Sequence, residues 1–256
     1  MFARFVLPHR PRHRWRVAVA SARRMLADPQ DVPAILTFVS ALPGVMPWVL
    51  HDRFHRSPQG RKLLAERPQL LDAVQFERLE RLPPHSLGGA YFAFLQRSNV
   101  SPEGLERAFV AAGNELADDD EWRYIEQRGR VSHDLWHTVL GYEADLVGEM
   151  AIAIFTAVQT GNLGLAAFSL AWCLRQGPFA LDDPRLQAGH AIIRGAAARA
   201  WRASPLCVAP WEELLACDLE GVRERLGVGA PPSYTPVGFH DLADWSRRRT
   251  AIEVVE

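Results

Sequence analysis

The 256-residue sequence has little cysteine and no uninterrupted apolar segment long enough to cross a bilayer. Its three cysteines, Cys173, Cys207 and Cys217, are odd in number and lack CxxC spacing, which argues against a disulfide framework and a cysteine zinc site. The most apolar stretch, residues 150–174, is interrupted at residues 159–162, and each half is about half the roughly 20 residues of a spanning helix. No secretory signal is visible, because arginines follow the short apolar start. We therefore expect a cytoplasmic protein without a transmembrane helix.

The sequence also has no excess of positive or negative charge. The 29 basic and 30 acidic side chains leave a net charge of -1, so no overall field favours nucleic acid as a partner. The N-terminus departs from this average, since seven arginines and no acid precede residue 25: Arg4, Arg10, Arg12, Arg14, Arg16, Arg23 and Arg24. A helix predicted over residues 12–27 places Trp15, Val19, Ala22 and Leu26 on one face. This helix could rest on an anionic membrane surface or present a solvated arginine face.

Strand signals are scarce, whereas helix-start signals recur. Ser-Pro or Asp-Pro pairs, which combine an N-cap with a proline at the first helical position, predict helices near 58–66, 102–114 and 184–202. Ser86 and Pro210 predict two more, the second ending before Gly227. We therefore expect an all-α fold with a single helical domain over residues 1–228. A C-terminal extension, residues 229–256, shows no periodic pattern and is expected to be loose.

A short segment contains four potential metal ligands: His133, Asp134, His137 and Glu149. His133 and His137 stand at i and i+4, so a helix would project both imidazoles from one face. Asp134 lies three residues before His137, at the edge of that face. Two imidazoles and a carboxylate from one turn form part of a metal coordination shell.

Glu149 can join this shell only if the helix breaks. On one continuous helix it would lie about 18 Å beyond His137. Gly141 as a C-terminal cap and Asp145 as an N-cap predict a helical hairpin that turns at 141–145 and returns Glu149 to His137. The spacing therefore predicts a two-helix clamp for one divalent ion. Zinc suits these ligands best, and iron, manganese and cobalt suit them too. The alternative is that these residues are ordinary core or surface side chains.

Several motifs resemble the fourth coenzyme Q biosynthesis protein family. The run from residue 127 to 137, followed by Glu149 after eleven residues, is similar to the family's HDxxH…E signature. Further blocks that resemble the family are Gly60-Arg61 through Glu66-Arg67-Pro68, Leu82-Pro83-Pro84-His85-Ser86-Leu87-Gly88, and Trp211-Glu212-Glu213. The likeness covers roughly residues 25–228. Gly129 and the segment 102–106 depart from the pattern, and the arginine-rich start and residues from 229 onward have no counterpart.

The resemblance implies a helical protein that binds a polyprenylated aromatic lipid in an apolar pocket. It implies a carbon–carbon lyase that removes the ring carboxylate of a polyprenylated 4-hydroxybenzoate precursor of ubiquinone, in some accounts with hydroxylation at the same carbon. It also implies peripheral association with the inner membrane and other ubiquinone-biosynthesis enzymes as partners. We expect a homodimer. Residues 150–158 and 163–174 could line the pocket or be core helices, and Arg130 could pair with the substrate carboxylate or be a solvated surface residue.

Other functions fit these residues less well or remain open. Asp134 replaces the glutamate of an HExxH metalloprotease and would not reach as far. A phosphohydrolase of the HD type would need distant ligands, and the spacing of His190 and His240-Asp241 does not favour it. The main alternative is a non-catalytic scaffold that presents the lipid to partner enzymes, with a structural metal site. A structural site would be closed by four protein ligands, whereas a catalytic one would keep an open position.

Overall fold

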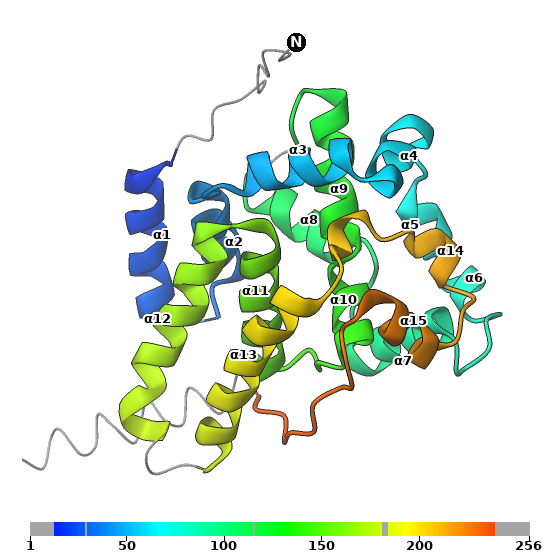
Figure 1. Cartoon of the computed structure of the whole chain (residues 1–256). Helices are drawn as coiled ribbons and strands as arrows, with labels where there is room; N and C mark the ends of the chain where they lie inside the picture. The colour runs from blue at the N-terminus through cyan, green and yellow to red at the C-terminus, as the bar shows by residue number, and fades with distance from the viewer. Residues whose placement is uncertain (1–12, 29, 115, 181–183, 239–256) are drawn as a thin grey trace, which may run out of the picture.

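The structure, a computed structural model, describes residues 13–28, 30–114, 116–180 and 184–238. Every regular element in these ranges is a helix, and the one β-type contact among them is an isolated bridge between Ser86 and Asp218. The predicted all-α class is confirmed. In chain order the helices are α1 (Trp15–Ala27), α2 (Val32–Ala41), α3 (Met46–Arg56), α4 (Pro58–Glu66), α5 (Leu70–Ala73), α6 (Phe76–Leu79), α7 (Leu87–Ser98), α8 (Gly104–Ala111), α9 (Asp120–Val131), α10 (His133–Leu140), α11 (Leu146–Thr160), α12 (Leu163–Ala180), α13 (Pro184–Arg202), the 3-10 turn η1 (Leu206–Val208), α14 (Trp211–Leu214) and α15 (Leu219–Leu226) (Figure 1).

Helix α11 forms the centre of the fold and packs against α12 and α13 (Figure 1). Its sequence is apolar on nearly all sides, which is typical of a helix surrounded by others. Phe155 and Ile152 belong to the main core cluster, together with Trp211 of α14 and Tyr91 of α7. Gln159 is the polar exception. Its side-chain nitrogen donates to three backbone carbonyls, one near the end of α13 and two just after it. Its side-chain oxygen accepts from the Leu206 amide. Full hydrogen bonding offsets the cost of burying this side chain.

Helix α1 lies at one side of the molecule and packs on α2 (Figure 1). Ala18 and Ser21 are its buried residues, and Ala18 forms a small cluster with Ala41 and Leu42. The apolar stripe predicted from the sequence therefore faces solvent, with Trp15 57% and Leu26 67% exposed. The helix begins at Trp15, and residue 12 of the predicted range lies outside the described residues.

Most predicted helix starts are observed, and one predicted helix is wrong. Helices α4 and α7 begin at the predicted Ser57 and Ser86 caps, and α13 runs from Pro184 through Arg202. The helix expected from Pro210 to the residue before Gly227 is divided into α14 and α15. The chain turns between them because the carbonyls of Leu215 and Cys217 accept hydrogen bonds from the first amides of α7.

The segment after α15 also differs from the expectation of a loose extension. Residues 228–238 run along the turn between α10 and α11, and Val237 is fully buried. Residues 239–256 of the predicted extension lie outside the described residues.

The three cysteines are free: Cys207 is buried, Cys173 is partly buried and Cys217 is exposed. Across the described residues, no single helix combines the length and apolar character needed to span a membrane. Helices α2 and α3 meet both criteria only as a pair, and they are bent by 74° where they join.

Candidate metal centre

A helical hairpin formed by α10 and α11 creates the site, as the capping residues predicted. Helix α10 ends at Gly141, whose φ of +73° is a left-handed conformation that favours glycine. Helix α11 begins after Asp145, whose side chain accepts from the amides of Val147 and Gly148. Gly148 is required there because an added Cβ would lie 1.9 Å from the Glu143 carbonyl oxygen. The tight turn brings the first turn of α11 beside α10.

The turn gathers three of the four predicted ligands. Among the described residues, one group of three metal-binding side chains has its ligand atoms within 4.8 Å of one another: His133, His137 and Glu149. The Nε2 atom of His133 lies 3.6 Å from Glu149 Oε2, and that of His137 lies 3.5 Å from Glu149 Oε1. The two imidazoles meet edge to face, with ring centroids 5.0 Å apart.

His137 is oriented as metal-binding histidines usually are. Its Nδ1 atom lies 3.1 Å from the Tyr142 carbonyl oxygen, to which the protonated nitrogen donates. That bond leaves the Nε2 lone pair directed at Glu149, and a carbonyl partner of this kind commonly fixes the tautomer of a ligating histidine. The side chain is 0% exposed, and Nε2 has no hydrogen-bonding partner. A buried nitrogen without a partner is rare and requires an explanation.

The spacing of these atoms fits a divalent ion. Ligands about 2.0–2.2 Å from a tetrahedral ion lie about 3.3–3.6 Å from one another. The two histidine-to-carboxylate distances of 3.5 and 3.6 Å match that spacing and exceed the usual length of an N–H···O hydrogen bond. Two imidazole nitrogens and one carboxylate oxygen suit zinc and other transition metals.

The two histidines also keep the Glu149 carboxyl group ionised. Burial opposes the charge of Glu149, yet the nearby His137 and His133 outweigh burial and hold the pKa of Glu149 well below its usual range. Burial likewise opposes the charge of His133, but its contact with Glu149 raises the pKa of His133 overall. Glu149 is therefore a carboxylate at neutral pH, as metal binding requires.

Asp134, the fourth predicted ligand, lies beside this group but outside it. Burial raises the pKa of Asp134, while His133 and His137 oppose the shift. Tyr91 is fully buried, its hydroxyl has no hydrogen-bonding partner, and burial followed by the charge of Asp134 raises its pKa well above the usual range. The charge of Asp134 thus interacts with the two histidines and with Tyr91 of α7, and its role as a ligand stays a prediction.

Arg130 points toward α8. Its Nη2 atom donates to the Asn114 carbonyl oxygen at 3.2 Å, and its guanidinium lies 4.5 Å from the centroid of the Phe109 ring. These contacts hold the side chain against the end of α8 and the loop after it. The predicted pairing of Arg130 with a substrate carboxylate stays a prediction.

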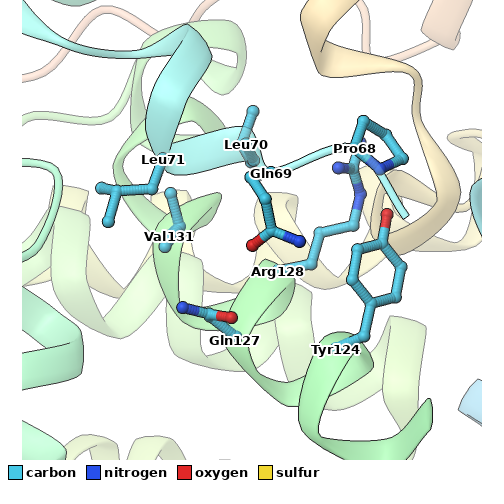
Figure 2. Close-up of a pocket in the computed structure, with 8 residues that line it drawn as sticks. All are labelled: Pro68, Gln69, Leu70, Leu71, Tyr124, Gln127, Arg128 and Val131. Atoms are coloured by element: carbon cyan, nitrogen blue, oxygen red, sulfur yellow. The ribbon is translucent and has the colours of Figure 1, made fainter. Parts of the chain in front are cut away.

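Arg128 is the important residue that sequence reasoning passed over. Its guanidinium is almost fully buried and donates to both carboxylate oxygens of Glu212, at 2.6 and 2.9 Å, and to the Ala209 carbonyl oxygen. Figure 2 shows the side chain extending from α9 past Tyr124 toward Pro68. The adjoining cavity of about 10 Å³ is too small for a substrate. Three sequence blocks that carried the family resemblance therefore meet here for structural reasons, around Pro68, Arg128 and Glu212.

Comparisons with known proteins agree with these motifs. The family model described as coenzyme Q (ubiquinone) biosynthesis protein Coq4 matches residues 5–232. The human mitochondrial ubiquinone biosynthesis protein COQ4 homolog is 33% identical over 239 residues, which cover 89% of this chain and 83% of the human one. The mitochondrial ubiquinone biosynthesis protein coq4 of Pyrenophora tritici-repentis is 33% identical over 221 residues, with 84% and 72% covered.

A solved structure shares the fold. The crystal structure of a Nostoc punctiforme protein assigned to ubiquinone biosynthesis superposes with a TM-score of 0.61 at 19% identity, covering 85% of this chain and all of that one. The family match extends over most of the sequence, and it includes the hairpin with the cluster of His133, His137 and Glu149. This chain belongs to the Coq4 family of coenzyme Q (ubiquinone) biosynthesis proteins.

Proposed function

We propose that this chain holds one divalent ion at His133, His137 and Glu149 and uses it to remove the ring carboxylate of a polyprenylated 4-hydroxybenzoate precursor of ubiquinone. The observation that carries the proposal is the buried Nε2 of His137, which faces Glu149 without a hydrogen-bonding partner. Zinc is the ion favoured by this ligand set, and iron, manganese and cobalt remain compatible with it. Three protein ligands would leave room for substrate or water at the ion, as catalytic sites do.

This decarboxylation needs a group that stabilises negative charge and a group that supplies a proton. When bound, the ion would act as a Lewis acid toward oxygens of the ring substituents and stabilise negative charge on the ring. As the bond between the ring and the carboxylate breaks, carbon dioxide leaves and the ring carbon takes up a proton. The carboxyl group of Asp134 lies beside the histidines with a raised pKa and can carry that proton. Hydroxylation at the same carbon would need an oxidant as well, and the proposed reaction is the decarboxylation alone.

We propose that the apolar tail of the substrate lies along α11, α12 and α13. Leu146, Val147 and Met150 follow Asp145 at the metal end of α11, and they pack with Trp172 and Ile193 in a second apolar cluster. A tail bound along these helices would have its ring near Glu149 because the same turn of α11 carries both. The scaffold alternative uses the same lipid site with no chemistry at the ring.

Glu149→Gln separates these functions, because it keeps the size of the side chain and removes the charge that attracts a divalent ion. We expect the variant to fold but, in a deletion strain, to accumulate the carboxylated precursor and restore less than about a tenth of the ubiquinone. Glu143→Gln is the matched control, since Glu143 lies in the loop just before α11 and its carboxylate pairs only with exposed Arg97 among the contacts described. Normal ubiquinone from a folded, metal-depleted Glu149→Gln protein would support the scaffold instead.

A further inference from the structure

The segment over residues 228–238, here called the C-terminal strap, contacts the turn between α10 and α11 at several points. Val237 makes two hydrogen bonds with it: its carbonyl accepts from the Leu146 amide at 2.9 Å, and its amide donates to the side-chain oxygen Oδ2 of Asp145 at 2.7 Å. Pro231 lies against Gly141, where an added Cβ would approach to 2.3 Å. The strap therefore covers the turn from the end of α10 to the start of α11.

Tyr234 links the two sides of that turn. Its hydroxyl donates to Asp145 Oδ1 at 2.7 Å and accepts from the Glu143 amide at 3.0 Å. Burial and the Asp145 carboxylate hold the pKa of Tyr234 well above its usual range, so the phenol remains a donor at neutral pH. The Tyr234 hydroxyl thus connects Asp145, which caps α11, to the backbone of Glu143.

The buried carboxylate of Asp145 consequently has four donors. Two are the amides of Val147 and Gly148 within α11, and two come from the strap, the Tyr234 hydroxyl and the Val237 amide. A carboxylate held on both oxygens cannot rotate, and it fixes the helix start whose first turn includes Glu149. The Glu149 amide donates to the Asp145 carbonyl at 2.8 Å, which connects the ligand directly to this cap.

We propose that Tyr234 and the C-terminal strap are positioning elements for the metal centre, which hold the start of α11 so that the Glu149 carboxylate faces His133 and His137. The inference rests on the proposed metal site and deepens it. Val237 gives the strap its anchor, because it is fully buried with Leu146, Val147 and Met150. Tyr234 and Val237 act through Asp145, which caps the helix that carries Glu149.

Tyr234→Phe in the full-length protein tests this role, because it removes the hydroxyl and keeps the ring. We expect the dissociation constant for Zn²⁺ to rise roughly tenfold or more, the range observed when the partners that orient metal ligands are lost. In the metal-free protein, the amides of residues 147–149 should exchange with deuterium faster while amides in α7 keep their rates. Thr235→Ala is the matched control, since Thr235 is the next residue and is exposed.

Asp145→Ser provides a second variant that does not depend on Tyr234. Serine still caps a helix, but its single oxygen cannot receive the helix amides together with the two donors of the strap. It should weaken Zn²⁺ binding to a similar extent. Wild-type affinity and exchange rates in both folded variants would overturn the inference. If the wild-type protein itself takes up no Zn²⁺, the proposed function fails, and unchanged exchange at 147–149 in Tyr234→Phe would separately refute the positioning role.

Discussion

At the scale of single residues, the fold depends on a few charged side chains that are buried with their partners. Arg128 is the clearest case, because its side chain is 2% exposed and its charge is neutralised by Glu212 at 21% exposure. Bidentate pairing supplies both charge and geometry, which a lysine could not match. Removing one member of such a pair leaves an uncompensated charge in the interior.

Glu212→Gln should therefore lower the free energy of unfolding by about 3 kcal/mol, the lower end of the range for breaking a buried pair. Denaturant unfolding of the metal-free protein measures the change. Glu213→Gln is a close control, because its neighbouring carboxylate pairs with Lys62 at an exposed position, and we expect its stability to stay near that of the wild type. Equal effects of the two substitutions would show that Arg128 does not depend on Glu212.

At the scale of helices, the sequence predicted the features that depend on residues close together in the chain, namely the helix starts and the hairpin turn. Caps such as Ser57, Ser86 and Asp145 act on amides two or three residues ahead, so helix starts and the hairpin turn could be anticipated. The division between α14 and α15 could not, because it depends on hydrogen bonds from α7, far away in the sequence. The strap was missed for the same reason, since Tyr234 finds its partners only in the folded chain.

Helix α1 is the element with an unusual surface. Its exposed face combines Trp15 and Val19 with Arg16 and Arg23. A helix that presents both apolar and cationic side chains to solvent is suited to an anionic lipid surface. We propose that α1 is a membrane contact of this chain.

The double variant Arg16→Gln/Arg23→Gln should bind vesicles containing phosphatidylserine roughly tenfold more weakly than the wild type, since each arginine near an anionic surface contributes to attraction. High salt should weaken binding of the wild type in the same way. Vesicles of phosphatidylcholine alone serve as the uncharged comparison in a sedimentation assay. Undiminished binding of the double variant to the anionic vesicles would place the membrane contact elsewhere.

At the scale of the whole molecule, elements distant in sequence converge on the end of α10. Arg199 of α13 donates to the Leu140 carbonyl, and Arg223 of α15 donates to those of Thr138 and Val139. Cations at these free carbonyls stabilise the end of a helix. The strap then closes the turn from the other side. The sequence could predict that His133, His137 and Glu149 come together, whereas this surrounding support arises from tertiary contacts.

The metal content of gently purified protein, measured per chain by elemental analysis, tests the central claim most directly. We expect about one divalent transition-metal ion in the wild type. In His137→Ala, which removes the buried nitrogen facing Glu149, we expect nearly none, because two remaining ligands hold an ion far more weakly. His85→Ala, a histidine outside the group, should retain the ion. A wild-type protein that contains no such ion and takes none up from solution, or a His137→Ala variant that binds it as well as the wild type, would contradict the account.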